Sequence, residues 1–202
     1  MRRRGLVSIA LAAGVVALAV PSQAAGGLTV TDAVGDANGL NSQALGLPVP
    51  STSTAPADVA AADITSLAFK TVYRTVGGRR VPHGFTITLK LAAAPTEDVL
   101  YGLTADISST CDGTNSTMQF GHQDLGPLST DLAVCQQPAG SAGTAVDIGT
   151  TEVDAAKQTI TWTVNPDAPI GAKVTNIQAT TSVFVLGVFD ELTSPGTFVY
   201  GK

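Results

Sequence analysis

A strict alternation of apolar and polar residues constrains this chain more than any other feature. In residues 159–164, TITWTV, the apolar Ile160, Trp162 and Val164 alternate with three threonines, and residues 83–92, HGFTITLKLA, follow the same pattern. Successive side chains of a β-strand point to opposite faces of its sheet. The pattern is therefore typical of antiparallel strands that bury one face and expose the other.

The alternation recurs often enough to predict an all-β chain. Strands are expected over residues 28–32, 63–74, 83–92, 99–108, 117–120, 131–134, 145–153, 158–164 and 176–190. No stretch of ten or more residues outside the first 25 has a helical period. Short strands at this spacing predict an antiparallel two-sheet β-sandwich, Ig-like or jelly-roll-like.

Two segments depart from simple alternation. The last predicted strand is apolar on both faces from Val183 to Phe189, which predicts a central strand covered on both sides. Residues 40–62 are rich in Ser, Thr, Pro and Ala and have no period, which predicts a long mobile loop within one domain.

The first 25 residues have the form of a secretory signal peptide. Three arginines precede an apolar run from Leu6 to Val20, and small residues follow Pro21. The run is shorter than the roughly 20 residues that a spanning helix needs. We expect cleavage after Ala24 or Ala25, a single secreted domain over residues 26–202, and no membrane attachment after cleavage.

The charge balance limits the class of partner. The chain has 11 Lys and Arg against 16 Asp and Glu; loss of the three signal-peptide arginines leaves 11 − 3 = 8 against 16, a net charge of −8. A chain of this charge has no overall electrostatic attraction for nucleic acid or anionic lipid. We therefore expect neither as a partner.

Cys111 and Cys135 are the two cysteines of the chain. In an oxidising compartment such a pair predicts a disulfide, which would close a loop of about 25 residues and stabilise the fold by roughly 3 kcal/mol. A metal-binding pair or a reactive thiol is the alternative, and neither has supporting neighbours in the sequence.

Residues 31–40, TDAVGDANGL, place Asp32, Asp36 and Asn38 in a short turn with two glycines. Calcium prefers carboxylate and amide oxygens presented at such spacing by a turning backbone. The segment does not fit an EF-hand, because it lacks the closing acidic ligand. A hydrogen-bonded Asx turn is the alternative reading of the same residues.

A wider pattern includes this turn. A strand that ends in D-x-x-G-D-x-N-G, a variable loop and a strand that opens with A-D-I resemble the start of secreted bacterial β-sandwich modules related to DOMON and carbohydrate-binding families, such as the C-terminal domain of glucodextranase-type enzymes. The matching residues are Asp32, Gly35, Asp36, Asn38, Gly39, Asp63 and Ile64. The resemblance implies a calcium site in which Asp32, Asp36 and Asp63 converge and Asn38 supplies an amide oxygen.

Other functional signatures are scarce. Trp162 alternates with core residues, which predicts a buried side chain and not a sugar-binding platform. His83 and His122 are isolated, and we expect both at the surface. The chain lacks the common nucleophile, zinc-protease and phosphate-binding motifs.

The sequence thus predicts a secreted, non-catalytic binding or cell-surface module, stabilised by calcium and by no other cofactor. Its expected partner is an extracellular ligand such as a glycan or a cell-wall component. Two alternatives stay open: a structural or protein-interaction protein of the cell envelope, and a secreted hydrolase whose acidic residues come together only in the fold.

Overall fold

The computed structural model describes residues 27–39, 56–110, 114–123, 130–136, 146–165, 169–183 and 188–202. The predicted signal peptide lies outside these ranges, as does most of the predicted mobile loop. Cys135 lies on a strand, whereas Cys111 lies outside the described residues. The disulfide therefore stays a prediction.

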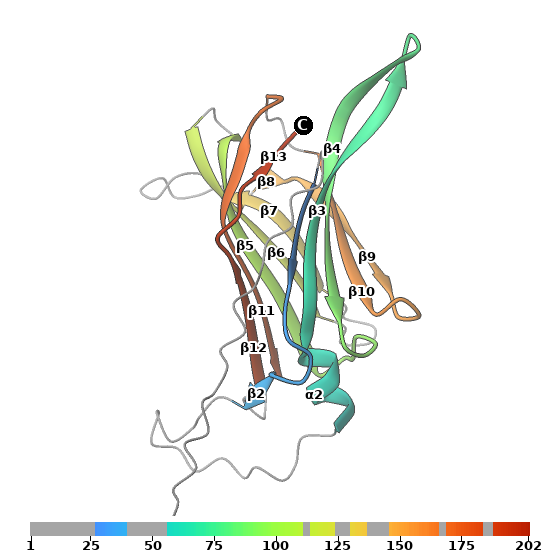
Figure 1. The fold of residues 1–202 in the computed structure, drawn as a ribbon, viewed down its shortest axis with the longest axis vertical. Helices are drawn as coiled ribbons and strands as arrows, with labels where there is room; N and C mark the ends of the chain where they lie inside the picture. Colours follow the sequence, from blue (N-terminus) through green and yellow to red (C-terminus); the bar gives the residue numbers. More distant parts are fainter. Residues whose placement is uncertain are drawn as a thin grey trace, which may run out of the picture.

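Two antiparallel sheets pack face to face (Figure 1). The first contains, in spatial order, β1 (Gly27–Thr31), β3 (Ile64–Val76), β4 (Arg79–Leu91), β10 (Thr159–Val164) and β9 (Gly149–Asp154). The second contains, in spatial order, β2 (Asn38–Gly39), β12 (Val188–Ser194), β11 (Lys173–Val183), β5 (Val99–Thr110), β6 (Thr114–Gln123), β7 (Thr130–Gln136) and β8 (Val146–Asp147), and β13 (Phe198–Val199) pairs with β11. The predicted antiparallel β-sandwich is confirmed.

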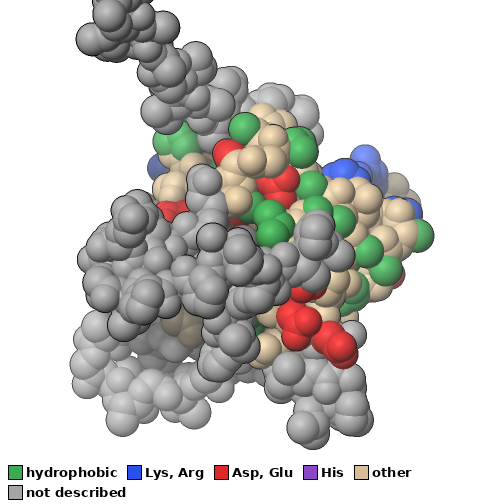
Figure 2. Space-filling model, turned by 90° about the horizontal axis from the view of Figure 1, so that it is seen from below, with side chains coloured by type: hydrophobic (Ala, Val, Ile, Leu, Met, Phe, Trp, Pro, Cys, Tyr) green, Lys and Arg blue, Asp and Glu red, His purple; other side chains and the backbone are tan. Residues whose placement is uncertain are grey.

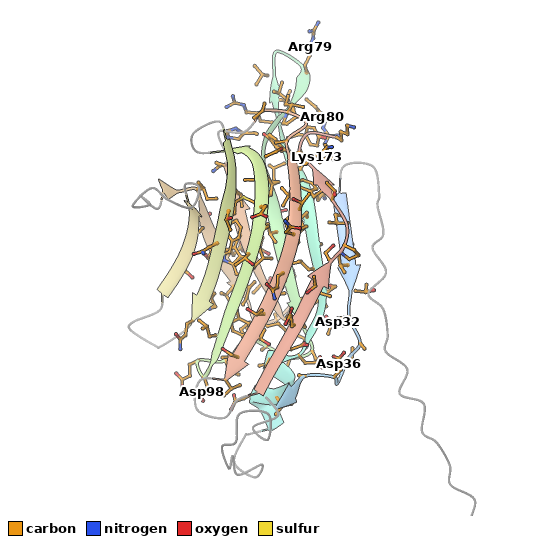
Figure 3. The ribbon with its side chains drawn as sticks, turned by 90° about the vertical axis from the view of Figure 1, so that its left-hand side faces the viewer. Asp32, Asp36, Arg79, Arg80, Asp98 and Lys173 are labelled. Atoms are coloured by element: carbon orange, nitrogen blue, oxygen red, sulfur yellow. The ribbon has the colours of Figure 1, made fainter. Side chains whose placement is uncertain are left out.

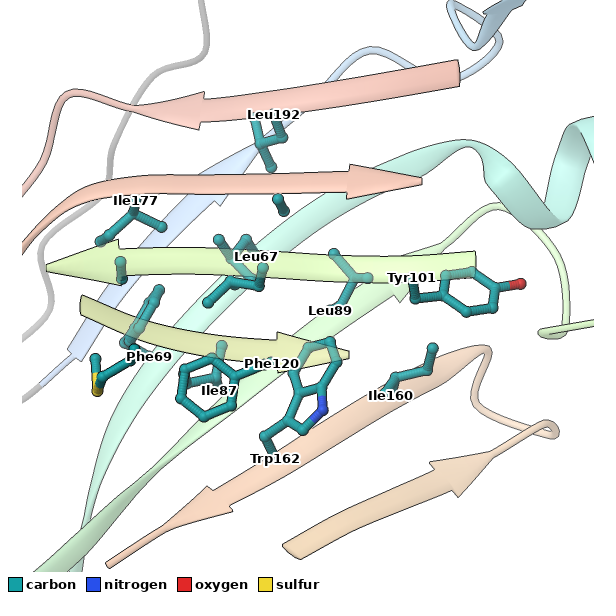
Figure 4. Close-up of a cluster of buried hydrophobic side chains, with 14 of the residues drawn as sticks. Leu67, Phe69, Ile87, Leu89, Tyr101, Phe120, Ile160, Trp162, Ile177 and Leu192 are labelled. Carbon is teal, nitrogen blue, oxygen red and sulfur yellow. The ribbon is translucent and has the colours of Figure 1, made fainter. Parts of the chain in front are cut away.

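Side chains at alternate strand positions fill the space between the sheets (Figure 4). Trp162 is fully buried, and its ring lies 5.9 Å from that of Phe120 on the opposite sheet. Its indole N–H points to the carbonyl oxygen of Gly121 at 3.5 Å. Trp162 is thus a core residue, as predicted, and offers no face to a ligand.

The chain passes from one sheet to the other at Ile148. The Ile148 N–H donates to the Ala133 carbonyl at 2.8 Å, and the Ile148 carbonyl accepts from Asn165 N–H at 2.9 Å. A Cβ on the next residue, Gly149, would lie 2.3 Å from the Thr163 carbonyl oxygen. Glycine is therefore required there, because the backbone of β10, the neighbouring strand in the same sheet, lies too close for a side chain.

The prediction of one long strand over residues 176–190 was wrong. The segment forms β11 and β12, which pair antiparallel, with Ser182 opposite Phe189. Residues 184–187 lie outside the described residues. Val183 ends β11, and Val188 and Phe189 begin β12. The described apolar positions of this segment therefore lie on two neighbouring strands that hydrogen-bond to each other.

The predicted mobile loop also needs correction at its end. Residues 56–62 form a short helix, α2 (Pro56–Ala62). Pro56 occupies the first helical position, where its missing N–H costs nothing, and Ala61 and Ala62 are fully buried against the end of the sandwich. No helix in the described ranges has the length and hydropathy needed to cross a bilayer.

The β3–β4 hairpin extends well beyond the other strands (Figure 1). β1 pairs with β3 as far as Lys70, and β10 pairs with β4 as far as Phe85. Residues 71–84 therefore form a two-stranded projection, which we call the arm. At its base Gly84 has φ +138°, and a Cβ there would lie 2.4 Å from the Val164 carbonyl oxygen.

Candidate metal centre

Three aspartates from two distant parts of the sequence meet near the end of the sandwich that carries α2. Asp32, Asp36 and Asp190 each offer a carboxylate oxygen, and these oxygens all lie within 4.8 Å of one another. Figure 3 places Asp32 and Asp36 at the end opposite the arm. Acidic side chains are also visible in several places on this end of the molecule (Figure 2).

The loop after β1 positions the first two aspartates. The Asp32 N–H donates to the Thr65 carbonyl at 3.0 Å, which continues the pairing of β1 with β3 by one residue. The Asp32 carboxylate accepts the N–H of Ala33 at 2.9 Å, and Gly35 follows with φ +86°. This turned backbone returns Asp36 toward Asp32.

Asp190 reaches the site from β12, in the other sheet. Its side chain is 6% exposed, and its two oxygens accept the N–H groups of Ile64 at 2.6 Å and Glu191 at 2.8 Å. The bond to Ile64 joins β12 to the start of β3. Asp190 therefore links the two sheets and is held in one orientation.

Asp63 lies beside the cluster and has an unsatisfied oxygen. It is 3% exposed, and its Oδ2 accepts the Gly35 N–H at 2.7 Å. Its Oδ1 is buried and has no hydrogen-bond partner. A buried carboxylate oxygen without a donor is unfavourable. A hydrogen-bond donor or a cation beside this atom would therefore stabilise the folded state.

Burial and the charges of neighbouring aspartates raise the pKa values of Asp32, Asp63 and Asp190. Burial raises the pKa of Asp190 to about 6, against the opposing effect of the Ile64 N–H and with further increases from Asp32 and Asp36. Burial also raises the pKa of Asp32 and of Asp63, and the charge of Asp36 adds to both shifts. Ionised carboxylates are thus destabilised here, and a bound cation would reverse that effect.

The arrangement fits calcium in both chemistry and size. The three donors that the described residues bring together are hard carboxylate oxygens, which calcium prefers at 2.3–2.6 Å. Two oxygens on opposite sides of one such ion would be about 4.6–5.2 Å apart. The 4.8 Å spread of the three carboxylates matches that span.

The structure places the four predicted calcium ligands as follows. It brings Asp32 and Asp36 together and places Asp63 next to their loop through the bond to Gly35. Asn38 lies on β2, opposite Phe189, and so enters the region beside Asp190, but its side chain is outside the described part of the structure.

Sequence reasoning missed Asp190. The residue stands 127 positions after Asp63, and no metal-ligand motif surrounds it in the sequence. Its position depends on the pairing of β11 with β12 and of β12 with β2. The available signal was an acidic residue directly after an apolar run, where a carboxylate on the strand would enter a buried environment.

The prediction for His122 was wrong. His122 is 5% exposed, its Nδ1 lies 2.8 Å from the Asp131 carboxylate, and its ring stacks on Tyr101 at 6.1 Å. It shares the inward face of β6 with Met118 and Phe120, so the alternation itself would have placed it inside. His83 is exposed, as predicted.

Comparisons with known proteins give no relative for this chain: no family model, no curated protein and no solved structure matches it.

Proposed function

We propose that this chain is a secreted, non-catalytic β-sandwich binding module. One calcium ion would organise the loop after β1 at the end of the sandwich that carries α2. The observation that carries the proposal is the convergence of Asp32, Asp36 and Asp190 within 4.8 Å, beside the unsatisfied oxygen of Asp63. The signal-peptide pattern and the resemblance of the D-x-x-G-D-x-N-G turn to secreted β-sandwich modules support the same function.

Calcium would act here as a link between the sheets. Asp32 follows β1 and Asp63 precedes β3, both in the first sheet, whereas Asp190 belongs to β12 in the second. Asp36 comes from the loop that leads to β2. An ion held by these residues would join both sheets and fix the loop, and would offset the repulsion among the carboxylates.

The test is thermal unfolding of the purified protein with EDTA, calcium or magnesium. A ligand that binds only the folded state at 100 times its Kd adds about 2.7 kcal/mol to the free energy of unfolding. We expect calcium to raise the Tm of the wild type, magnesium to raise it less, and Asp36→Ala to remove the calcium response. Equal melting temperatures in EDTA and in millimolar calcium would refute the site.

A secreted hydrolase is the second candidate, because the same cluster includes a carboxyl group whose pKa burial raises to about 6, in the range of a general acid. Against it, Asp190 is 6% exposed and both of its oxygens already accept backbone N–H groups. Release of reducing sugar from a panel of polysaccharides, lost in Asp32→Asn, would favour this candidate over the binding module.

A further inference from the structure

The arm concentrates positive charge in an acidic chain. Residues 71–84 contain Arg74, Arg79 and Arg80 and no Asp or Glu, although acidic residues outnumber basic ones in the whole sequence by 16 to 11. The described part of the chain offers these three guanidinium groups no ion pair. Figure 3 shows Arg79 and Arg80 at the end of the molecule opposite Asp32 and Asp36.

The arm has no strand neighbours of its own in the described structure. Its outer residues, from Arg74 to Arg80, are all exposed. A two-stranded ribbon is at best marginally stable in water, and three like charges on it repel one another. A projection with these properties is explained more readily by an anionic partner than by the stability of the sandwich.

The side chains of the arm are arranged on two faces, each mixing positive charge with apolar surface. On one face Arg74 lies opposite Val81 and Val76 lies opposite Arg79. Val76 is 51% exposed. On the other face the Arg80 guanidinium lies 4.5 Å from the centre of the Tyr73 ring, which holds it in place.

This mixture distinguishes among anionic partners. Guanidinium groups bind carboxylates through paired hydrogen bonds, and the valines and Tyr73 provide apolar surface for the C–H faces of sugar rings. Inorganic phosphate polymers lack such apolar faces. Nucleic acid has one negative charge per 1.7 Å of duplex. This charge is denser than that of a glycan with one carboxylate per sugar unit, so the rest of this acidic molecule would repel nucleic acid more strongly.

We propose that the arm is the ligand-binding element of the module and that its ligand is an acidic polysaccharide, a glycan chain carrying carboxylate groups. Arg74, Arg79 and Arg80 would bind the carboxylates, and Val76 and Tyr73 would contact the sugar rings. This assignment rests on the proposed binding function but not on the calcium site, which lies at the other end of the sandwich.

Affinity electrophoresis in gels containing polygalacturonate, with EDTA present so that calcium cannot bridge protein and polymer, tests the assignment. The wild type should be retarded by polygalacturonate and not by neutral dextran. The triple variant R74Q/R79Q/R80Q should bind about tenfold more weakly or worse. The matched control K70Q/K90Q/K157Q removes the same charge from exposed positions outside the arm and should stay within about twofold of the wild type.

A second variant separates contact with sugar from simple charge attraction. Val76→Ser keeps all three arginines and should weaken retention by polygalacturonate without changing retention by polyphosphate. Binding would be assigned to charge alone if the two triple variants lost affinity equally, or if polyphosphate retained the wild type as strongly as polygalacturonate. No retention of the wild type by polygalacturonate would overturn the proposal, and arm-dependent self-association in sedimentation would replace the glycan with a second copy of the chain.

The calcium site and the glycan-binding arm can be refuted independently of each other. The R74Q/R79Q/R80Q variant should keep the full calcium-dependent rise in Tm, and Asp36→Ala should keep its retention by polygalacturonate. Loss of retention in Asp36→Ala would show that the calcium end and not the arm controls binding, which contradicts the assignment to the arm.

Discussion

The two ends of this sandwich carry charges of opposite sign in different environments. At the α2 end, aspartates from both sheets lie close together, and burial and neighbouring charges raise the pKa values of Asp32, Asp63 and Asp190. At the arm end, three arginines project into solvent on a ribbon that contains no carboxylate. Like charges held in a packed site need a counter-ion within the site, whereas like charges on an exposed ribbon are available to a partner.

The largest expected effect tests where the core ends and the arm begins. Phe85 is fully buried and packs against Phe198, at 5.4 Å between ring centres, and against Tyr200, at 6.0 Å. Phe85→Ala should lower the free energy of unfolding by about 3–5 kcal/mol. Val76→Ala, on the arm, should change it by less than about 0.5 kcal/mol. Urea denaturation measures both, and a large loss in Val76→Ala would show that the arm contributes to the core.

The next effect is the pH dependence of the metal-free protein. The pKa of Asp190 is about 6 in the folded state and 3.8 when exposed, so between these values the folded state binds more protons than the unfolded state. The contribution of this group to stability is therefore fully present below about pH 4 and is lost as pH rises through about 6. In EDTA, Tm should fall over that range, and Asp190→Asn should flatten the fall.

The pKa values of Asp32 and Asp63 are raised, as is the pKa of Asp190, so their contributions to stability are also lost as pH rises. Asp154, paired with Lys157 at 2.6 Å in the β9–β10 turn, has a lowered pKa, and its contribution is lost as pH falls. Asp154→Asn is thus the control: it should leave the slope between pH 4 and 6 unchanged. If Tm fell equally steeply with pH in the wild type and in Asp190→Asn, the aspartate cluster would not be the cause of the pH dependence.

The smallest effect compares single charges at the two ends. Asp36 raises the pKa of three other aspartates through its charge. In EDTA, Asp36→Asn should therefore raise the free energy of unfolding, by about 1 kcal/mol. Arg79→Gln on the arm should change it by less than about 0.5 kcal/mol. Destabilisation by Asp36→Asn in EDTA would indicate that hydrogen bonds of Asp36 outweigh the repulsion.

Local patterns in the sequence predicted most of the sandwich, because alternation reports directly which side of a strand is buried. The β9–β10 hairpin and the burial of Trp162 follow from residues 145–164 alone. The division of residues 176–190 into two strands did not, because an apolar run has the same appearance in one central strand and in two paired ones.

The candidate site was predictable only in part. Asp32, Asp36 and Asp63 share a recognisable turn and strand start, and the structure places them in one region. Asp190 arrives through pairing between strands that are distant in sequence, and such pairing leaves no trace in the local pattern. The burial of His122 is a different case, because its place in the alternation with Met118 and Phe120 does predict an inward side chain although the residue is polar.

The exposed ribbon of the arm has one more consequence. From Thr71 outward both of its strands have an unpaired edge in the described structure, and such edges can recruit strands from other molecules and start aggregation. Pro82, which pairs with Tyr73, has no N–H and so removes one backbone donor from the arm. The arginines add charge repulsion between copies. Residues that would recognise a glycan thus also keep the projecting strands from adding to those of a neighbouring molecule.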